Sequence, residues 1–139
     1  MELIHTQLTP RNAVRPELAA VTVRATADTG AAFLCIPPHV AMQLQADELE
    51  KREVTLADGS PKLVSHAGPV RIQYADRSCF VGALVMGDEV LLGAIPMEDM
   101  DLVLHPLMQS VSVNPKNPNF AASVAKGVGA ARDSEDIRS

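Results

Sequence analysis

The apolar residues of this chain occur in short runs that Pro, Gly, Asn or Asp separate, and each run is about the length of one β-strand. Many runs are rich in β-branched residues, and Val70–Tyr74 alternates apolar and polar side chains with the two-residue period of a half-buried strand. The predicted strands cover Leu3–Leu8, Val21–Ala25, Phe33–Ile36, Val54–Leu56, Leu63–Val64, Val70–Tyr74, Cys79–Met86, Val90–Leu92 and Val111–Val113. Short strands at such spacing indicate a small, mostly antiparallel barrel or sandwich.

Two segments have the pattern of short helices instead. Pro38 suits a first helical position, and Val40, Ala41 and Leu44 then share one helical face. After Pro96, the segment Met97–Val103 carries acidic residues in its first turn, and Pro106 prevents its continuation. Both predicted helices are only about two turns long, so tertiary packing must hold them.

The end of the chain differs in composition from the rest. Residues 120–139 consist largely of Ala, Gly, Ser and charged residues and show no strand pattern. We therefore predict one folded domain over residues 1–119 and a flexible C-terminal tail over residues 120–139. The charged run Asp47–Glu53 is interpreted as a solvated connection within the domain.

Composition narrows the classes of function. Of 139 residues, 47% are hydrophobic and 21% charged, as expected for one packed domain. The chain has 12 Lys and Arg and 17 Asp and Glu, and the resulting net charge of -5 argues against nucleic-acid binding. Neither a signal peptide nor an apolar run of about 18 residues is evident, so we expect a cytoplasmic protein without a membrane span. Aromatic residues are only 3%, and the core must use Val, Leu, Ile, Ala and Met.

The potential metal ligands do not form a recognisable site. Two cysteines are too few for a disulfide scaffold, and neither they nor the histidines have metal-ligand spacing. These residues are Cys35, Cys79, His5, His39, His66 and His105. No phosphate-binding loop, dinucleotide motif or serine-nucleophile motif is present in the sequence. We expect neither a metal nor an organic cofactor.

The candidate chemistry lies in Asp28-Thr29-Gly30, directly after a predicted strand. Taken alone, this tripeptide is more often an ordinary turn. Its context changes the interpretation, because Leu91-Leu92-Gly93-Ala94 precedes the second predicted helix and a hairpin-like stretch around Asp58-Gly59 lies between the two motifs.

This order of motifs resembles the retropepsin-like aspartic proteases (clan AA) from about Leu3 to Val113. It looks closest to the small bacterial branch of that family, in which Ala-Asp-Thr-Gly-Ala and Leu-Leu-Gly-Ala-Ile-Pro recur. The resemblance implies an all-β fold, a closed acid-protease barrel with one or two short helices. It also implies an aspartic endopeptidase that hydrolyses an extended peptide or protein substrate.

The resemblance assigns roles within the motif. Asp28 is the implied catalytic carboxylate, and Thr29 is implied to hydrogen-bond the backbone of a neighbouring copy of the motif. Gly30 permits a tight turn with its amide near a carboxylate, and Ala31 leaves the floor of the cleft uncrowded. The implied supporting residues beneath this loop are Leu91, Leu92 and Gly93. The implied flap, which would close over the substrate, contains Ala57, Asp58, Gly59 and Ser60.

The number of motifs implies the assembly. The family's chemistry uses two carboxylates that share one proton, yet this chain has one Asp-Thr-Gly and no internal repeat. A symmetric homodimer supplies the second Asp28 at a two-fold axis. We therefore expect an obligate homodimer with one active site per pair.

Three departures from the family pattern leave alternatives open. Ala25–Ala27 is small and partly polar where bulky apolar residues are usual, Ala94 stands where viral members have Arg, and the flap has fewer glycines. One alternative is therefore a peptide-binding or dimerisation module with little or no catalysis. Another is a structural domain whose tail, residues 120–139, recruits a partner.

Overall fold

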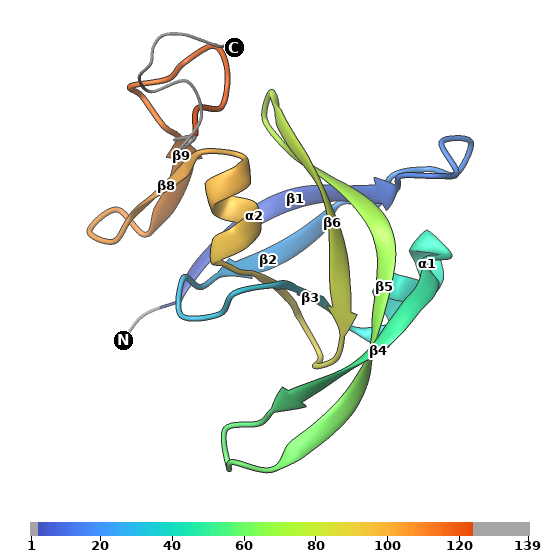
Figure 1. Cartoon of the computed structure of the whole chain (residues 1–139). Helices are drawn as coiled ribbons and strands as arrows, with labels where there is room; N and C mark the ends of the chain where they lie inside the picture. Colours follow the sequence, from blue (N-terminus) through green and yellow to red (C-terminus); the bar gives the residue numbers. More distant parts are fainter. Residues whose placement is uncertain (1–2, 124–139) are drawn as a thin grey trace, which may run out of the picture.

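The computed structural model describes residues 3–123 of the chain. This part contains β-strands and two short helices (Figure 1). In chain order they are β1 (Ile4–Asn12), β2 (Val23–Ala27), β3 (Leu34–Ile36), α1 (Pro38–Leu44), β4 (Asp47–Thr55), β5 (Pro61–Tyr74), β6 (Arg77–Val85), β7 (Val90–Leu92), α2 (Ala94–Asp99), β8 (Leu102–His105) and β9 (Ser110–Val113).

The strands form a closed barrel. Strands β1, β2, β7, β3, β6 and β5 are neighbours in that order, and the antiparallel pairing of β1 with β5 closes the ring. Among the strands of residues 3–123, β4 pairs with β5 alone and extends the sheet outside the barrel, while β8 and β9 form a separate two-stranded hairpin. The prediction of an all-β barrel with short helices is confirmed.

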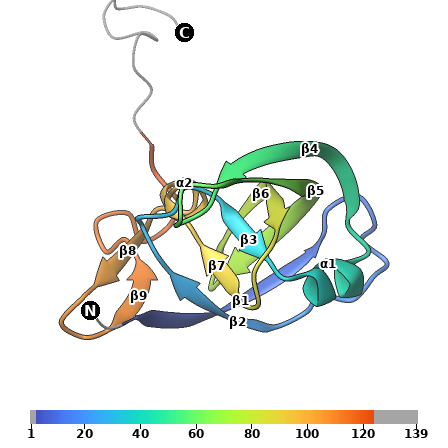
Figure 2. The same cartoon turned by 90° about the horizontal axis from the view of Figure 1, so that it is seen from below.

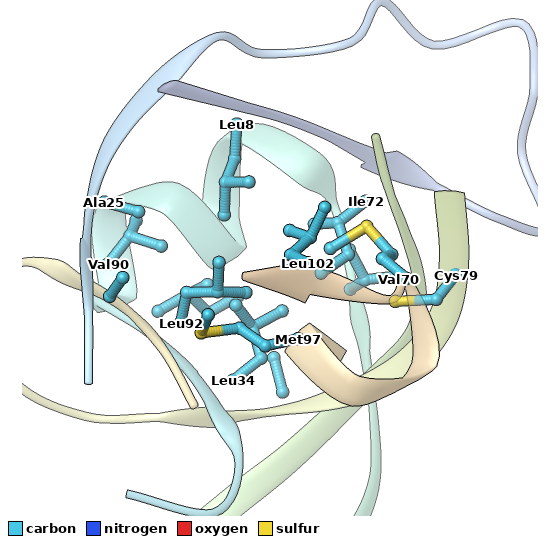
Figure 3. Packing of buried hydrophobic residues seen from close by; sticks show 14 of the residues in the cluster. Leu8, Ala25, Leu34, Val70, Ile72, Cys79, Val90, Leu92, Met97 and Leu102 are labelled. Atoms are coloured by element: carbon cyan, nitrogen blue, oxygen red, sulfur yellow. The ribbon is translucent and has the colours of Figure 1, made fainter. Parts of the chain in front are cut away.

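The core consists of small and medium-sized apolar side chains, as the composition predicts. Leu8, Leu34, Ile72 and Leu92 fill the barrel interior and are at most 1% exposed. Figure 3 shows their packing with Met97 of α2, so the second helix closes one end of the core. The three phenylalanines all lie at the surface.

The second helix differs from its prediction. It begins at Ala94 and ends at Asp99, and Leu102–His105, which overlaps the predicted helix, is strand β8. Asp101 adopts a left-handed conformation with φ of 55°, which ends the helical geometry. The next residues pair with β9, and this pairing outweighs their weak helical pattern.

The charged run Asp47–Glu53 is not a connection but most of strand β4, so that interpretation was wrong. Its backbone pairs with β5, while most of its side chains remain exposed to solvent. Strand β5 is also longer than predicted, because it joins two predicted strands across an irregularity at Ala67–Val70. A charged edge strand of this kind resists pairing with other chains.

A polar network ties the segment after β9 to the barrel. Arg77 is 4% exposed and donates hydrogen bonds to the backbone oxygens of Met100 (3.0 Å) and Asn117. Asp101 accepts hydrogen bonds from the Asn114 side chain (3.1 Å), the Asn117 side chain (2.7 Å) and the backbone amide of Ala122 (3.1 Å). The predicted tail beyond residue 123 lies outside the described part of the chain.

The Asp101 network predicts sensitivity to acid. Hydrogen bonds from Asn114, then from the amide of Ala122, lower the pKa of Asp101. Because the folded state lowers this pKa, the carboxylate stabilises the fold above its unfolded pKa of about 4 and loses that effect as pH falls through the folded pKa. Asp101→Asn should therefore lower the melting temperature at neutral pH, and its difference from the unaltered protein should shrink in acid. Glu98→Gln, at an exposed position of α2, is the control; an equal difference at every pH would contradict this prediction.

No helix in residues 3–123 is long and apolar enough to cross a membrane.

Candidate active site

The Asp28 loop begins where strand β2 ends. The Asp28 amide donates to the backbone oxygen of Leu92 (3.0 Å), which continues the parallel pairing of β2 with β7. The chain then turns: the Gly30 amide donates to Oδ1 of Asp28 (2.8 Å), and the Ala31 amide donates to the Asp28 backbone oxygen (3.1 Å). The backbone of its own loop thus orients the Asp28 carboxylate, which remains exposed to solvent.

The second motif lies directly against this loop. Leu92 is fully buried and Leu91 half-buried. A Cβ atom at Gly93 would lie 2.6 Å from the carbonyl carbon of Ala32 and 2.7 Å from the backbone nitrogen of Phe33, so only glycine allows this approach. Past Gly93, the amides of Ala94 and Ile95 donate to the backbone oxygens of Ala31 (2.8 Å) and Ala32 (2.9 Å). The two motifs therefore hold each other through backbone hydrogen bonds.

The unusual Thr26 has polar partners. Its side chain is buried at 3% exposure, and its hydroxyl donates to Glu89, which precedes β7. The same oxygen lies 3.2 Å from Nδ1 of His5 on β1. A single hydroxyl thus links β1, β2 and the start of β7 two residues before Asp28, which explains how a polar residue is accommodated there.

A cavity of about 510 Å³ opens beside Asp28 and Thr29. Its other walls include Ile4 at the start of β1 and Leu104, Pro106 and Gln109 of the β8–β9 hairpin. Figure 2 shows this hairpin beside the start of β1, and β1 and β9 are in contact. Asp28 is the one carboxylate among the described residues that line this cavity.

Exposed apolar side chains surround the same region. Leu3 is 58% exposed, and Leu107 and Met108 at the tip of the hairpin are 101% and 75% exposed. Sequence reasoning assigned Met108 to core or interface space but did not identify Leu3 or Leu107 as contact residues, although two large apolar residues after Pro106 in a turn are a signal for a contact surface. These exposed apolar side chains lie close to the exposed Asp28 loop.

Comparison of the whole structure with solved structures shows the fold. A retroviral protease-like domain of Ddi1 from Leishmania major matches with a TM-score of 0.56 and 13% identity, covering 83% of this chain and 90% of that one. The chain has a retropepsin-like fold. The Simian Foamy Virus (mac) protease matches with a TM-score of 0.46 and 15% identity, covering 66% of this chain and 91% of that one. No family model and no curated protein sequence matches the chain.

The predicted flap of this retropepsin-like chain is the turn of the β4–β5 hairpin. The Leu56 amide donates to the Ser60 backbone oxygen (2.8 Å), and Gly59 adopts a φ of 85°. Hydrogen bonds from the Ser60 side chain and amide lower the pKa of Asp58. The flap residues Ala57–Ser60 do not line the cavity beside Asp28, so their contact with substrate stays a prediction.

Burial makes both cysteine thiols weak acids, which argues against either as an activated nucleophile. Burial, together with nearby Asp99, raises the pKa of Cys79 to about 12, so its thiol is protonated at neutral pH. Burial also raises the pKa of the half-buried Cys35. Within residues 3–123, no group of three or more His, Cys, Asp and Glu side chains is arranged to hold a metal ion.

Proposed function

We propose that this chain is an aspartic endopeptidase that acts as a homodimer through two Asp28 carboxylates, one from each subunit. The observation that carries the proposal is the exposed Asp28 loop, whose carboxylate is oriented by the Gly30 amide on a retropepsin-like barrel. The motifs Ala27–Ala31 and Leu91–Pro96 support an assignment to the small bacterial branch of these proteases.

The proposed reaction needs both carboxylates. Two carboxyl groups at hydrogen-bond distance cannot both ionise, so the pair holds one proton. The ionised Asp28 removes a proton from water as the water oxygen bonds to the peptide carbonyl carbon, and the protonated Asp28 of the partner subunit gives its proton to the carbonyl oxygen. The resulting tetrahedral diol then collapses: one carboxyl group gives its proton to the amide nitrogen while the other carboxylate takes a proton from a diol hydroxyl, so the C–N bond breaks, a carboxylic acid and an amine leave, and the pair again holds one proton. One water is consumed for each bond hydrolysed.

The cavity beside Asp28 supports the dimeric assembly. It offers one carboxylate per chain among the described residues, and the exposed side chains of Leu3, Leu107 and Met108 border the region. Burying such side chains against a second copy removes apolar surface from water, and pairing of the two loops supplies the second acid. The homodimer thus accounts for both the chemistry and the exposed apolar residues.

This assembly can be tested with Leu107→Glu. A charge at the fully exposed tip should not disturb the protomer, but it should weaken dimerisation at least about tenfold if that tip becomes buried. Sedimentation measures the oligomeric state, and cleavage of an unstructured protein should fall in parallel. Met42→Glu, at an exposed position of α1, is the matched control.

A second measurement, on the unaltered protein, separates the proposal from its alternative, a peptide-binding or dimerisation module with little or no catalysis. The unaltered protein should cleave an unstructured protein, and its specific activity should decline on dilution as dimers dissociate. Binding of peptides without any turnover would favour the alternative. Activity that is independent of concentration, in a protein that sediments as a monomer, would refute the shared site.

A further inference from the structure

A second cavity, of about 190 Å³, lies between β4, β5, β6 and α2, at the end of the loop that follows Asp28. Its apolar walls include Phe33 and Ile95, which are 37% and 47% exposed, and the buried Pro96. Its polar residues are Arg52 and His66. It is therefore a small apolar pocket with basic side chains at its edge.

The floor of this pocket depends on Gly82. A Cβ atom there would overlap the imidazole ring of His66, so the ring lies directly over the backbone of β6. Burial is the main cause that lowers the pKa of His66, and the positive charge of Arg52 lowers it further, although Glu50 opposes the shift. The imidazole is thus neutral at pH 7, and Arg52 is the full positive charge among the residues that line the pocket.

Arg52 links the flap hairpin to the loop that carries Asp28. Its guanidinium carbon lies 5.4 Å from the centre of the Phe33 ring, and its Nη2 donates to Glu50 (2.7 Å). Its side chain is 34% exposed. A guanidinium has five N–H donors, so donors remain for a carboxylate from outside the protein.

The pocket adjoins the loop that follows Asp28 but does not include Asp28 or Thr29. Phe33 ends the loop that begins at Asp28, and the Ile95 amide donates to the backbone oxygen of Ala32 (2.9 Å). Because Asp28 and Thr29 line a different cavity, a side chain that enters this pocket belongs to a residue away from the scissile bond.

We propose that this pocket binds a large aliphatic or aromatic side chain of the substrate peptide, and that Arg52 binds a carboxylate on a residue beside it. The apolar walls select the side chain by burial, and the guanidinium selects an acidic neighbour over a basic one by charge. This inference rests on the proposed endopeptidase function. It names the substrate class as peptides with an apolar residue next to an acidic one, at a fixed distance from the cleaved bond.

The experiment compares the cleavage patterns of two pocket variants and one control on a diverse synthetic peptide pool, read by mass spectrometry. At one substrate position, Arg52→Glu should lower the cleavage of peptides with an acidic residue about fivefold and raise the cleavage of peptides with a basic residue about fivefold. Ile95→Trp should reduce the preference for a large apolar residue at the adjacent position by about tenfold. The control is Arg71→Glu, because Arg71 also lies over a phenyl ring (6.0 Å, Phe80) but does not line the pocket.

The outcomes separate the pocket from the proposed catalysis. Cleavage with the same pattern in all variants, with folding verified by thermal unfolding, overturns the pocket and leaves the endopeptidase. If the unaltered protein cleaves nothing, the same pool is tested for binding. If the unaltered protein then retains peptides with an apolar residue beside an acidic one, and the Arg52→Glu variant does not, the pocket is supported and hydrolysis is refuted. A protein that neither cleaves nor retains any peptide refutes both. If Arg52→Glu fails to fold, Arg52→Gln, which should abolish the acidic preference, gives the same decision.

Discussion

Replacing Asp28 with Asn is expected to lower the rate of peptide-bond cleavage by about 10³-fold or more, with the fold and the dimer intact. The amide oxygen of Asn can still accept the hydrogen bond that the Gly30 amide donates (2.8 Å), so the loop keeps its conformation. An amide cannot take the proton of the attacking water, however, and a dimer of two such chains has no base at the site. The rate of cleavage of an unstructured protein measures the effect.

A matched substitution makes this result specific. Asp88→Asn changes an exposed carboxylate in the loop before β7 to the same amide and should leave cleavage unchanged. Sedimentation and thermal unfolding should not distinguish either variant from the unaltered protein. Proteolysis retained by a rigorously purified Asp28→Asn protein would show that another group performs the chemistry.

Mixing the two chains tests whether the site is shared. A dimer that combines one unaltered chain with one Asp28→Asn chain holds one carboxyl group, so it lacks either the base or the acid of the pair. Excess Asp28→Asn chain should therefore suppress the activity of the unaltered protein as subunits exchange. Activity that stays proportional to the amount of unaltered chain would contradict a shared site.

Those parts of the fold that depend on local patterns were predictable from the sequence. The alternation in Val70–Tyr74 and the β-branched runs correspond to barrel strands, and Pro38 begins the first helix as expected. The second helix was misplaced because its end depends on the left-handed conformation of Asp101 and on pairing between β8 and β9. Such pairing is a tertiary interaction that overrides a weak local preference.

The candidate site was predictable only in part, for a physical reason. Asp28 and Gly93 lie in motifs that the sequence displays, but the walls of the two cavities come from residues far apart in the chain. Arg52, for example, belongs to a charged run that was interpreted as a connection, and its place over Phe33 follows from the pairing of β4 with β5. Sequence spacing does not reveal contacts that only the closed barrel creates.

Gly93→Ala is expected to have the largest effect on stability and to reduce activity as well. The added methyl group would overlap the backbone at Ala32–Phe33, and backbone atoms cannot move without displacing the hydrogen bonds from Ala94 and Ile95. Overpacking against backbone of this kind should destabilise the protein by about 3 kcal/mol. Because the displaced segment continues to Asp28, cleavage should fall even at temperatures where the variant is folded.

Gly82→Ala is the matched control, because the atoms nearest to the same methyl group all belong to the imidazole of His66, a side chain that can rotate away. The two variants share the Gly→Ala change and its effect on the unfolded chain, so the difference between them isolates the native-state clash. Chemical denaturation at one fixed protomer concentration should give a free energy of unfolding about 2 kcal/mol lower for Gly93→Ala than for Gly82→Ala. Equal values would mean that the loop after Asp28 yields as easily as a side chain, and the two motifs would then not hold the Asp28 loop in place.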